Sequence, residues 1–91
     1  MNIKVNIFYP QLKQFINSRD SVTVDGSTVG ECLEDLVRQY PGIEKLLFDE
    51  KRHLLRQVFV HVNIESTRKL NLNEPVKDGD ELIIAVLLTG G

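Results

Sequence analysis

The chain opens with a strict alternation of apolar and polar side chains. Apolar residues occupy positions 3, 5 and 7, and polar residues occupy positions 2, 4 and 6. This period of two predicts a strand with one buried face. A second short strand is predicted at Ser21–Val24, after a stretch that begins at Pro10. We expect the two strands to form an antiparallel hairpin, with Leu12, Phe15 and Ile16 packing the connection onto the core.

A helix is predicted from Val29 to Tyr40. Thr28-Val29-Gly30-Glu31 matches a capping box, in which Thr at the cap and Glu three residues later satisfy exposed backbone amides. Behind it, apolar residues recur at helical spacing, with acidic residues filling the opposite face. Pro41-Gly42 ends this helix, and Ile43–Phe48 is predicted to form one further helical turn. The apolar positions of the predicted helix are Val29, Cys32, Leu33, Leu36, Val37 and Tyr40.

Two further strands are predicted in the second half of the chain. Gln57–Val62 is rich in β-branched residues, and Glu81–Val86 is nearly continuous in apolar residues. A strand of the second kind is buried on both faces, so it is expected in the sheet interior. Between the two lies a polar, turn-rich stretch with a brief strand predicted near residues 68–70, followed by an Asp78-Gly79 turn.

The order of elements is strand, strand, helix, strand, strand. This order predicts an α+β fold of the ubiquitin-like β-grasp type, a mixed four- to five-stranded sheet with one main helix on one face. The last strand should pair in parallel with the first, because the helix carries the chain back across the sheet. We expect one domain over residues 1–91, with a flexible C-terminal tail at residues 87–91.

Composition narrows the classes of partner. The net charge is −2, so the field of the whole molecule gives no reason to expect a nucleic acid or an anionic membrane. The longest apolar run, residues 82–88, is too short to cross a bilayer. A single cysteine excludes an internal disulfide and fits a reducing compartment. We therefore expect a cytoplasmic protein that is a monomer when free.

Candidates for chemistry within the body of the chain are weak. Cys32 falls on the apolar stripe of the predicted helix, which favours a core position over a role as sulfur relay. His53 and His61 have no cysteine or carboxylate partners at ligand spacing, so no metal site is predicted. No motif of a catalytic triad is present.

The chain ends on Gly90-Gly91, directly after an apolar run. Glycine lets backbone pass where side chains would clash, so such a tip can be threaded into a narrow site, with its α-carboxylate as the reacting group. The order of elements, the turn at residues 77–82, the Val60–Asn63 segment and this tail together resemble the ThiS/MoaD family of sulfur carrier proteins. The resemblance covers essentially the whole chain.

The resemblance implies a mechanism and a set of partners. An ATP-dependent adenylyltransferase related to ubiquitin-activating enzymes would convert the Gly91 carboxylate to an acyl-adenylate, and sulfide would displace AMP to leave a thiocarboxylate. Gly90 and Thr89 would thread through the site of that enzyme. The chain itself would be a protein co-substrate and not an enzyme. It would bind no cofactor, and ATP would be used by the activating partner.

Two departures from the family pattern bear on the pathway. The chain has Leu87-Leu88-Thr89 where several relatives carry proline, and the segment from Ile43 to Leu55 is longer than in the shortest, thiamine-type carriers. These features favour a recipient of the molybdopterin synthase or cysteine synthase kind over a thiamine route. The Leu54–Asn63 stretch looks closer to the cysteine-synthase type.

One surface is predicted to dock a partner. A single helix covers only one face of a small sheet, so Phe59, Leu87 and Leu88 could form an apolar patch on the other face. The alternative for both leucines is completion of the core strand. Two other functions stay open: a ubiquitin-like modifier joined to lysines through Gly91, and a β-grasp binding module with an inert tail.

Overall fold

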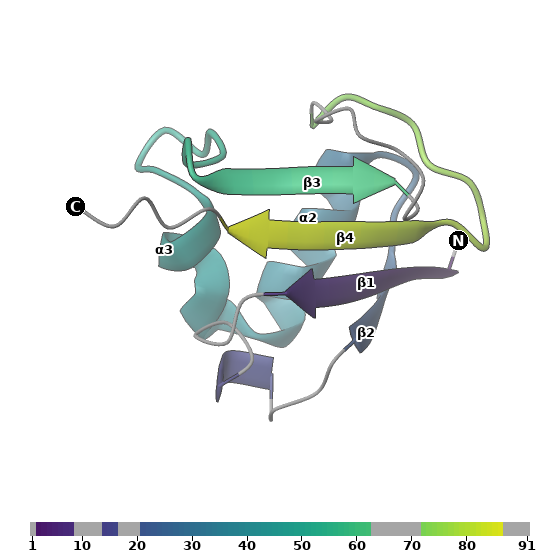
Figure 1. Cartoon of the computed structure of the whole chain (residues 1–91), viewed down its shortest axis with the longest axis horizontal. Coiled ribbons are helices and arrows are strands. Elements are labelled where there is room, and N and C mark those ends of the chain that lie inside the picture. Colours follow the sequence, from purple (N-terminus) through teal and green to yellow (C-terminus); the bar gives the residue numbers. More distant parts are fainter. Residues whose placement is uncertain (1, 9–13, 17–20, 63–71, 87–91) are drawn as a thin grey trace.

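The computed structural model of the chain describes residues 2–8, 14–16, 21–62 and 72–86 (Figure 1). Four strands in this part form one mixed sheet in the order β2-β1-β4-β3. β1 (Asn2–Phe8) pairs antiparallel with β2 (Ser21–Asp25) and parallel with β4 (Glu81–Val86). β4 also pairs antiparallel with β3 (Val58–Val62), so the apolar last strand lies inside the sheet. The predicted β-grasp order and the parallel pairing are confirmed.

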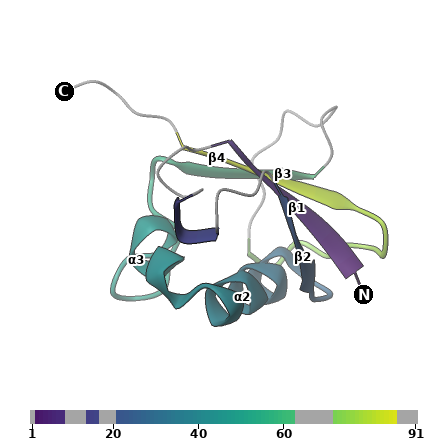
Figure 2. The same ribbon diagram turned by 90° about the horizontal axis from the view of Figure 1, so that it is seen from below.

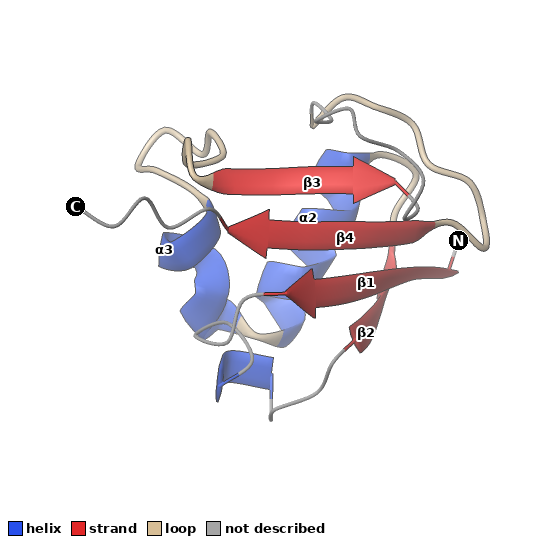
Figure 3. Cartoon of the chain, viewed as in Figure 1, coloured by secondary structure: helices blue, strands red, loops and turns tan. Residues whose placement is uncertain are grey.

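The helices pack on one side of this sheet, as the view along the sheet and the colouring by secondary structure show (Figure 2, Figure 3). α2 (Val29–Gln39) is the main helix, and η2 (Pro41–Ile43) and α3 (Glu44–Leu47) follow it directly. η1 (Gln14–Ile16) lies in the connection from β1 to β2. Ile16 is fully buried, as predicted, whereas Leu12 and the side chain of Phe15 lie outside the described residues. The brief strand predicted near residues 68–70 also lies outside them.

The N-terminus of α2 is held by both its own cap and a distant segment. The Thr28 hydroxyl accepts a hydrogen bond of 3.1 Å from the Glu31 amide, and the Glu31 carboxylate accepts from the Ser27 amide and hydroxyl at 2.8 and 2.7 Å. The amides of Val29 and Gly30 donate to the carbonyls of Glu74 and Leu72. The helix thus starts where the sequence predicts, with its otherwise unpaired amides satisfied.

The core lies between α2 and the covered face of the sheet. β1, β3 and β4 present every second side chain to it, and these side chains are fully or almost fully buried. Burying one side chain of this size contributes about 1.5–3 kcal/mol before entropy is counted. The core residues of these three strands are Ile3, Val5, Ile7, Val58, Val60, Leu82 and Ile84.

The turn before β4 fixes how that strand lies against β1. Gly79 has a φ of 91°, a backbone conformation that residues with a side chain rarely adopt. The carboxylate of Asp80 accepts from the Lys77 amide at 2.8 Å, and that of Asp78 accepts from the Asn2 amide at 2.8 Å. Because these bonds hold the start of β4 beside the start of β1, they set which residues of the two strands face each other.

Candidate functional site

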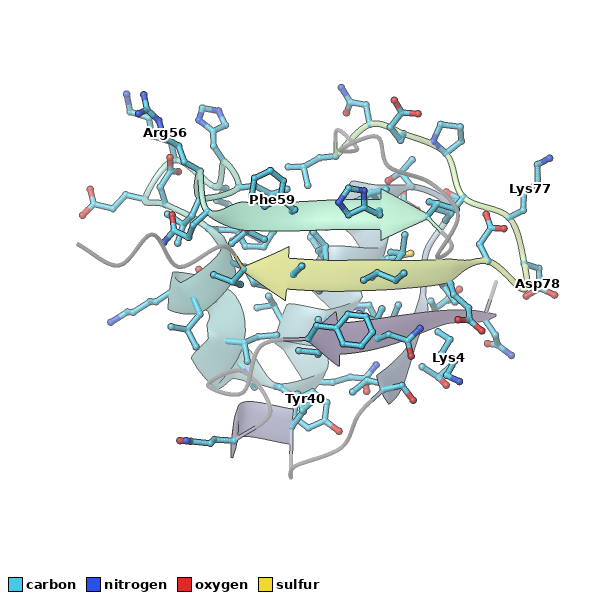
Figure 4. All side chains as sticks on the ribbon, viewed as in Figure 1. Lys4, Tyr40, Arg56, Phe59, Lys77 and Asp78 are labelled. Carbon is cyan, nitrogen blue, oxygen red and sulfur yellow. The ribbon has the colours of Figure 1, made fainter. Side chains whose placement is uncertain are left out.

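The face of the sheet opposite the helices carries the alternate residues of the same three strands. β1 contributes Lys4, Asn6 and Phe8 to it, β4 contributes Glu81, Ile83 and Ala85, and β3 contributes Phe59 and His61, as their pairing registers require. No described helix lies over this face; α2 and α3 lie behind the sheet in the view of Figure 4. We call it the open face.

The open face is divided into an apolar and a polar half. Phe8 faces Ala85 across one strand pair, and Phe59 faces Ala85 across the other, so the three form one row. Phe8 is 62% exposed and is the large hydrophobic residue left most open to solvent in the described part of the chain. Phe59 and Ala85 are half-buried, and the ring of Phe59 stands on β3 in Figure 4. An apolar row that includes an exposed aromatic side chain is a candidate partner site.

The polar half lies further from the end of β4. Asn6 and His61 face Ile83 from either side, and Lys4 faces Glu81. The Asn6 side-chain amide donates a hydrogen bond of 3.0 Å to the Glu81 carboxylate. The Asn6 amide and the Glu81 carboxylate are thus engaged with each other, away from the apolar row.

The apolar row lies beside the root of the tail. β4 ends at Val86, the residue after Ala85, at the edge where β1 also ends. Leu87, Leu88, Thr89, Gly90 and Gly91 lie outside the described residues, so their predicted roles stay predictions. Five extended residues span at most about 18 Å. Any protein that takes up the Gly91 carboxylate must therefore approach the surface around Val86.

Phe8 is the site residue that the sequence analysis missed. The signal was available, because the alternation that buries positions 3, 5 and 7 points position 8 to the opposite face. The predicted Phe59 does lie on the open face, in the same row. Its role in docking stays a prediction.

The other residues considered for chemistry, Cys32 and His53, lie away from this row. Cys32 is fully buried in the core, and burial raises the pKa of its thiol to about 11, so it is protonated at neutral pH. His53 is exposed in the loop before β3. The described residues contain no cluster of three groups suited to a metal ion. Within the same ranges, no helix is long and apolar enough to cross a membrane.

A hollow of about 340 Å³ lies at the N-terminus of α2 and is lined mainly by acidic side chains. Two of its carboxylates, those of Glu31 and Asp35, already have structural partners. Asp35 accepts from the Asp25 amide at 3.0 Å and from Arg38 and Gln39, while Glu31 caps the helix. This hollow is explained by helix capping.

Solved structures that share the fold of this chain include a small modifier protein and a sulfur-carrier-like protein. The solved structure of SAMP1, a small archaeal modifier protein, from Haloferax volcanii superposes with a TM-score of 0.84 at 28% identity and full coverage of both chains. The CysO of Amycolatopsis orientalis, solved in a complex with BexX, superposes with a TM-score of 0.82 at 33% identity, covering 98% of this chain and 99% of that one. The fold is thus that of ubiquitin-like carriers and modifiers.

Sequence comparison shows the family to which the chain belongs. A sequence model of the ThiS family matches residues 6–91, and the chain belongs to this family. The sulfur carrier protein CysO of Mycobacterium tuberculosis is 34% identical over 95 residues, with complete coverage of both chains. The resemblance to ThiS/MoaD-type carriers is confirmed, and with it a role as a sulfur carrier or ubiquitin-like protein.

Proposed function

We propose that the Gly91 carboxylate is adenylated by an ATP-dependent activating enzyme and then converted to a thiocarboxylate that donates sulfur. One observation carries the proposal: the chain matches a named sulfur carrier over the full length of both proteins and ends on Gly90-Gly91. The match of the ThiS family model extends to residue 91 and so includes the tail, which supports the proposal.

The chemistry requires an activated carboxyl group. A carboxylate oxygen attacks the α-phosphorus of ATP, pyrophosphate leaves, and a mixed anhydride with AMP forms. Sulfide then adds to the carbonyl carbon, and AMP leaves with the electron pair of the C–O bond. The side chains of Phe8, Phe59 and Ala85 in the apolar row beside the tail root offer no acid or base. The activating enzyme therefore supplies the catalytic groups, and this chain acts as its co-substrate.

The open face and the tail serve as the docking surface for that enzyme. The apolar half of the open face meets β4 where the tail begins, so a protein that holds the tail also covers Phe8 and Phe59. Leu87 and Leu88 are proposed to extend this surface. The enzyme is proposed to be an adenylyltransferase related to ubiquitin-activating enzymes.

The recipient is proposed to be a synthase that forms cysteine or a related sulfur compound. The curated relatives at 34% identity are named CysO sulfur carriers, which favours the cysteine route over the molybdopterin route. The complex of a CysO with BexX supports the idea that a carrier of this shape binds a second protein.

The likeness to SAMP1 favours a second candidate function. At a TM-score of 0.84, that modifier shares the fold over its whole length. The same activated Gly91 could be joined to lysines of other proteins, and recovery of lysine-linked conjugates from cells would establish this role. A binding module with an inert tail is the third alternative, and it would be indifferent to loss of Gly91.

The test is pyrophosphate release from ATP in the presence of the activating enzyme. We expect release that depends on the intact chain and is abolished when Gly91 is deleted. Lys45→Ala, which changes an exposed residue of α3 and leaves the tail and the open face intact, is the control and should stay active. Equal release with the Gly91-deleted chain would contradict the proposal.

A further inference from the structure

The strand β2 lies at an edge of the sheet, and in the described part of the chain β1 is the strand beside it (Figure 1). In an antiparallel pair, alternate residues turn both the backbone amide and the carbonyl away from the neighbouring strand. On β2 these residues are Ser21, Thr23 and Asp25, because the Thr23 carbonyl and the Asp25 amide bond to side chains of α2. A row of outward backbone groups is a template on which another strand can add.

Two side chains of α2, those of Asp35 and Gln39, cover part of this row. The Asp35 carboxylate accepts a hydrogen bond of 3.0 Å from the Asp25 amide, and the Gln39 side-chain amide donates one of 3.1 Å to the Thr23 carbonyl. The Gln39 side chain also donates, at 3.0 Å, to the same Asp35 oxygen that accepts from Asp25. The two side chains and the two backbone groups therefore form one continuous hydrogen-bond network.

This network reproduces the bonding of one residue of an added strand. In a parallel pair, a single residue donates its amide to one carbonyl of the neighbouring strand and accepts from the amide two residues further on. Gln39 supplies the donor for Thr23, and Asp35 supplies the acceptor for Asp25. Residues four apart lie on the same side of a helix, so α2 presents both groups together.

Neither the backbone of β2 nor the helix needs this network for its own hydrogen bonding. Thr23 and Asp25 are exposed, so water would satisfy their backbone groups equally well. Asp35 and Gln39 lie beyond the first turn of α2, where the unpaired amides of the helix are. The other oxygen of Asp35 accepts from Arg38 at 3.1 Å, which fixes the orientation of the carboxylate. What the network does is occupy bonding positions that another strand would use.

We propose that Asp35 and Gln39 close the edge of β2 against a second copy of this chain and so keep the protein monomeric. β2 itself carries little protection, since it has no proline and its one charged residue is Asp25. Without the cover, β2 would pair with β2 of another copy about a two-fold axis, with the two Thr23 residues opposite each other. Asp25 would then face Ser21 of the other copy, so no two like charges would meet directly. This role is separate from the function proposed above.

The test is the oligomeric state of the double variant Asp35→Ala, Gln39→Ala, measured by sedimentation equilibrium over a wide range of protein concentration. Alanine favours helix, so α2 should be kept, which circular dichroism checks. We expect the wild type to keep the mass of a monomer throughout and the double variant to rise toward the mass of a dimer. The matched control is Asp35→Asn, which makes the same change in net charge but keeps an oxygen that can accept from the Asp25 amide. It should stay a monomer.

Hydrogen exchange locates the effect on β2. In dilute solution, the Asp25 amide should exchange about tenfold faster in Asp35→Ala than in the wild type, with the Leu36 amide in α2 unchanged. In the dimer of the double variant, the Thr23 amide should become protected. A dimer without this protection would form at another surface and would overturn the proposal.

Other results would also overturn it. These are a double variant that stays monomeric at every concentration, an Asp25 amide whose exchange does not change, and a wild type that already dimerises. Equal self-association of Asp35→Asn would assign the effect to charge and not to the covered edge. If the double variant does not fold, Gln39→Ala uncovers the Thr23 carbonyl alone and must still raise the mass at high concentration.

Discussion

The two faces of the sheet have opposite characters along β1, β4 and β3, where alternate residues of the same strands point to each face. On the covered face, Ile3, Val60 and Ile84 are fully buried against the helical layer. On the open face, the alternate residues include Phe8, which is 62% exposed, and the half-buried Phe59. The contrast indicates that the covered face stabilises the fold, whereas docking is proposed for the open face. Substitutions on the two faces should therefore affect different measurements.

The largest effect on stability is expected for the covered face. Ile84→Ala removes a fully buried side chain from the central strand and should lower the free energy of unfolding by about 3 kcal/mol. Urea denaturation followed by circular dichroism measures this change. A loss of less than about 1 kcal/mol would show that the core around β4 repacks freely, and it would weaken the contrast between the faces.

Phe8→Ala tests the open face from the same sheet. Because this ring is mostly exposed, the free energy of unfolding should fall by less than about 1 kcal/mol. The KM for adenylation should nevertheless rise about tenfold, because the ring is part of the proposed docking surface. A variant that is strongly destabilised but has a normal KM for adenylation would show that Phe8 stabilises the fold and does not take part in docking.

The cap of α2 should affect stability and not docking, since α2 is the helix that packs on the covered face of the sheet. Thr28→Ala removes the hydroxyl that accepts from the Glu31 amide and should cost about 1 kcal/mol. KM for adenylation should stay at its wild-type value. Thermal melts and the pyrophosphate assay on the same sample separate these two outcomes, and a changed KM would link the helix to docking.

The smallest effect concerns the pH dependence of the same cap. Hydrogen bonds from the Ser27 hydroxyl and then the Ser27 amide hold the pKa of the Glu31 carboxyl below its ordinary value of 4.5. Because the pKa of this carboxyl is lower in the folded state than in the unfolded state, its ionisation stabilises the fold at pH values above the unfolded-state pKa. This stabilisation disappears as the pH falls through the folded-state pKa. Glu31→Gln should therefore melt below the wild type at pH 7. The gap should close at a pH well under 4.5, and a gap that persists in acid would contradict this cause.

The sequence was most informative where structure depends on neighbours in the chain. The Thr28 cap, the apolar stripe of α2 and the alternation in β1 all follow from local spacing, and the structure confirms them. The continuous apolar character of residues 82–86 was enough to place β4 inside the sheet.

The row on the open face could not be derived in the same way. It depends on the registers that bring Phe8 and Phe59 opposite Ala85, and these are set by contacts between distant parts of the chain, including the Asp78 bond to the Asn2 amide. The segment 72–74, which holds the first amides of α2, gave no sequence signal for the same reason. Of the three residues in the row, only Phe59 was predicted for this face, together with Leu87 and Leu88 outside the described residues, and its place in a row emerged only from strand pairing.

The most direct test of the account is the intact mass of the chain after reaction with the activating enzyme, ATP and sulfide. The account predicts a product in which one oxygen of the Gly91 carboxylate is replaced by sulfur. The product should be lost again on transfer to the recipient synthase and absent for the Gly91-deleted chain. An unchanged mass under conditions in which the enzyme releases pyrophosphate from the wild-type chain would contradict the sulfur-carrier role.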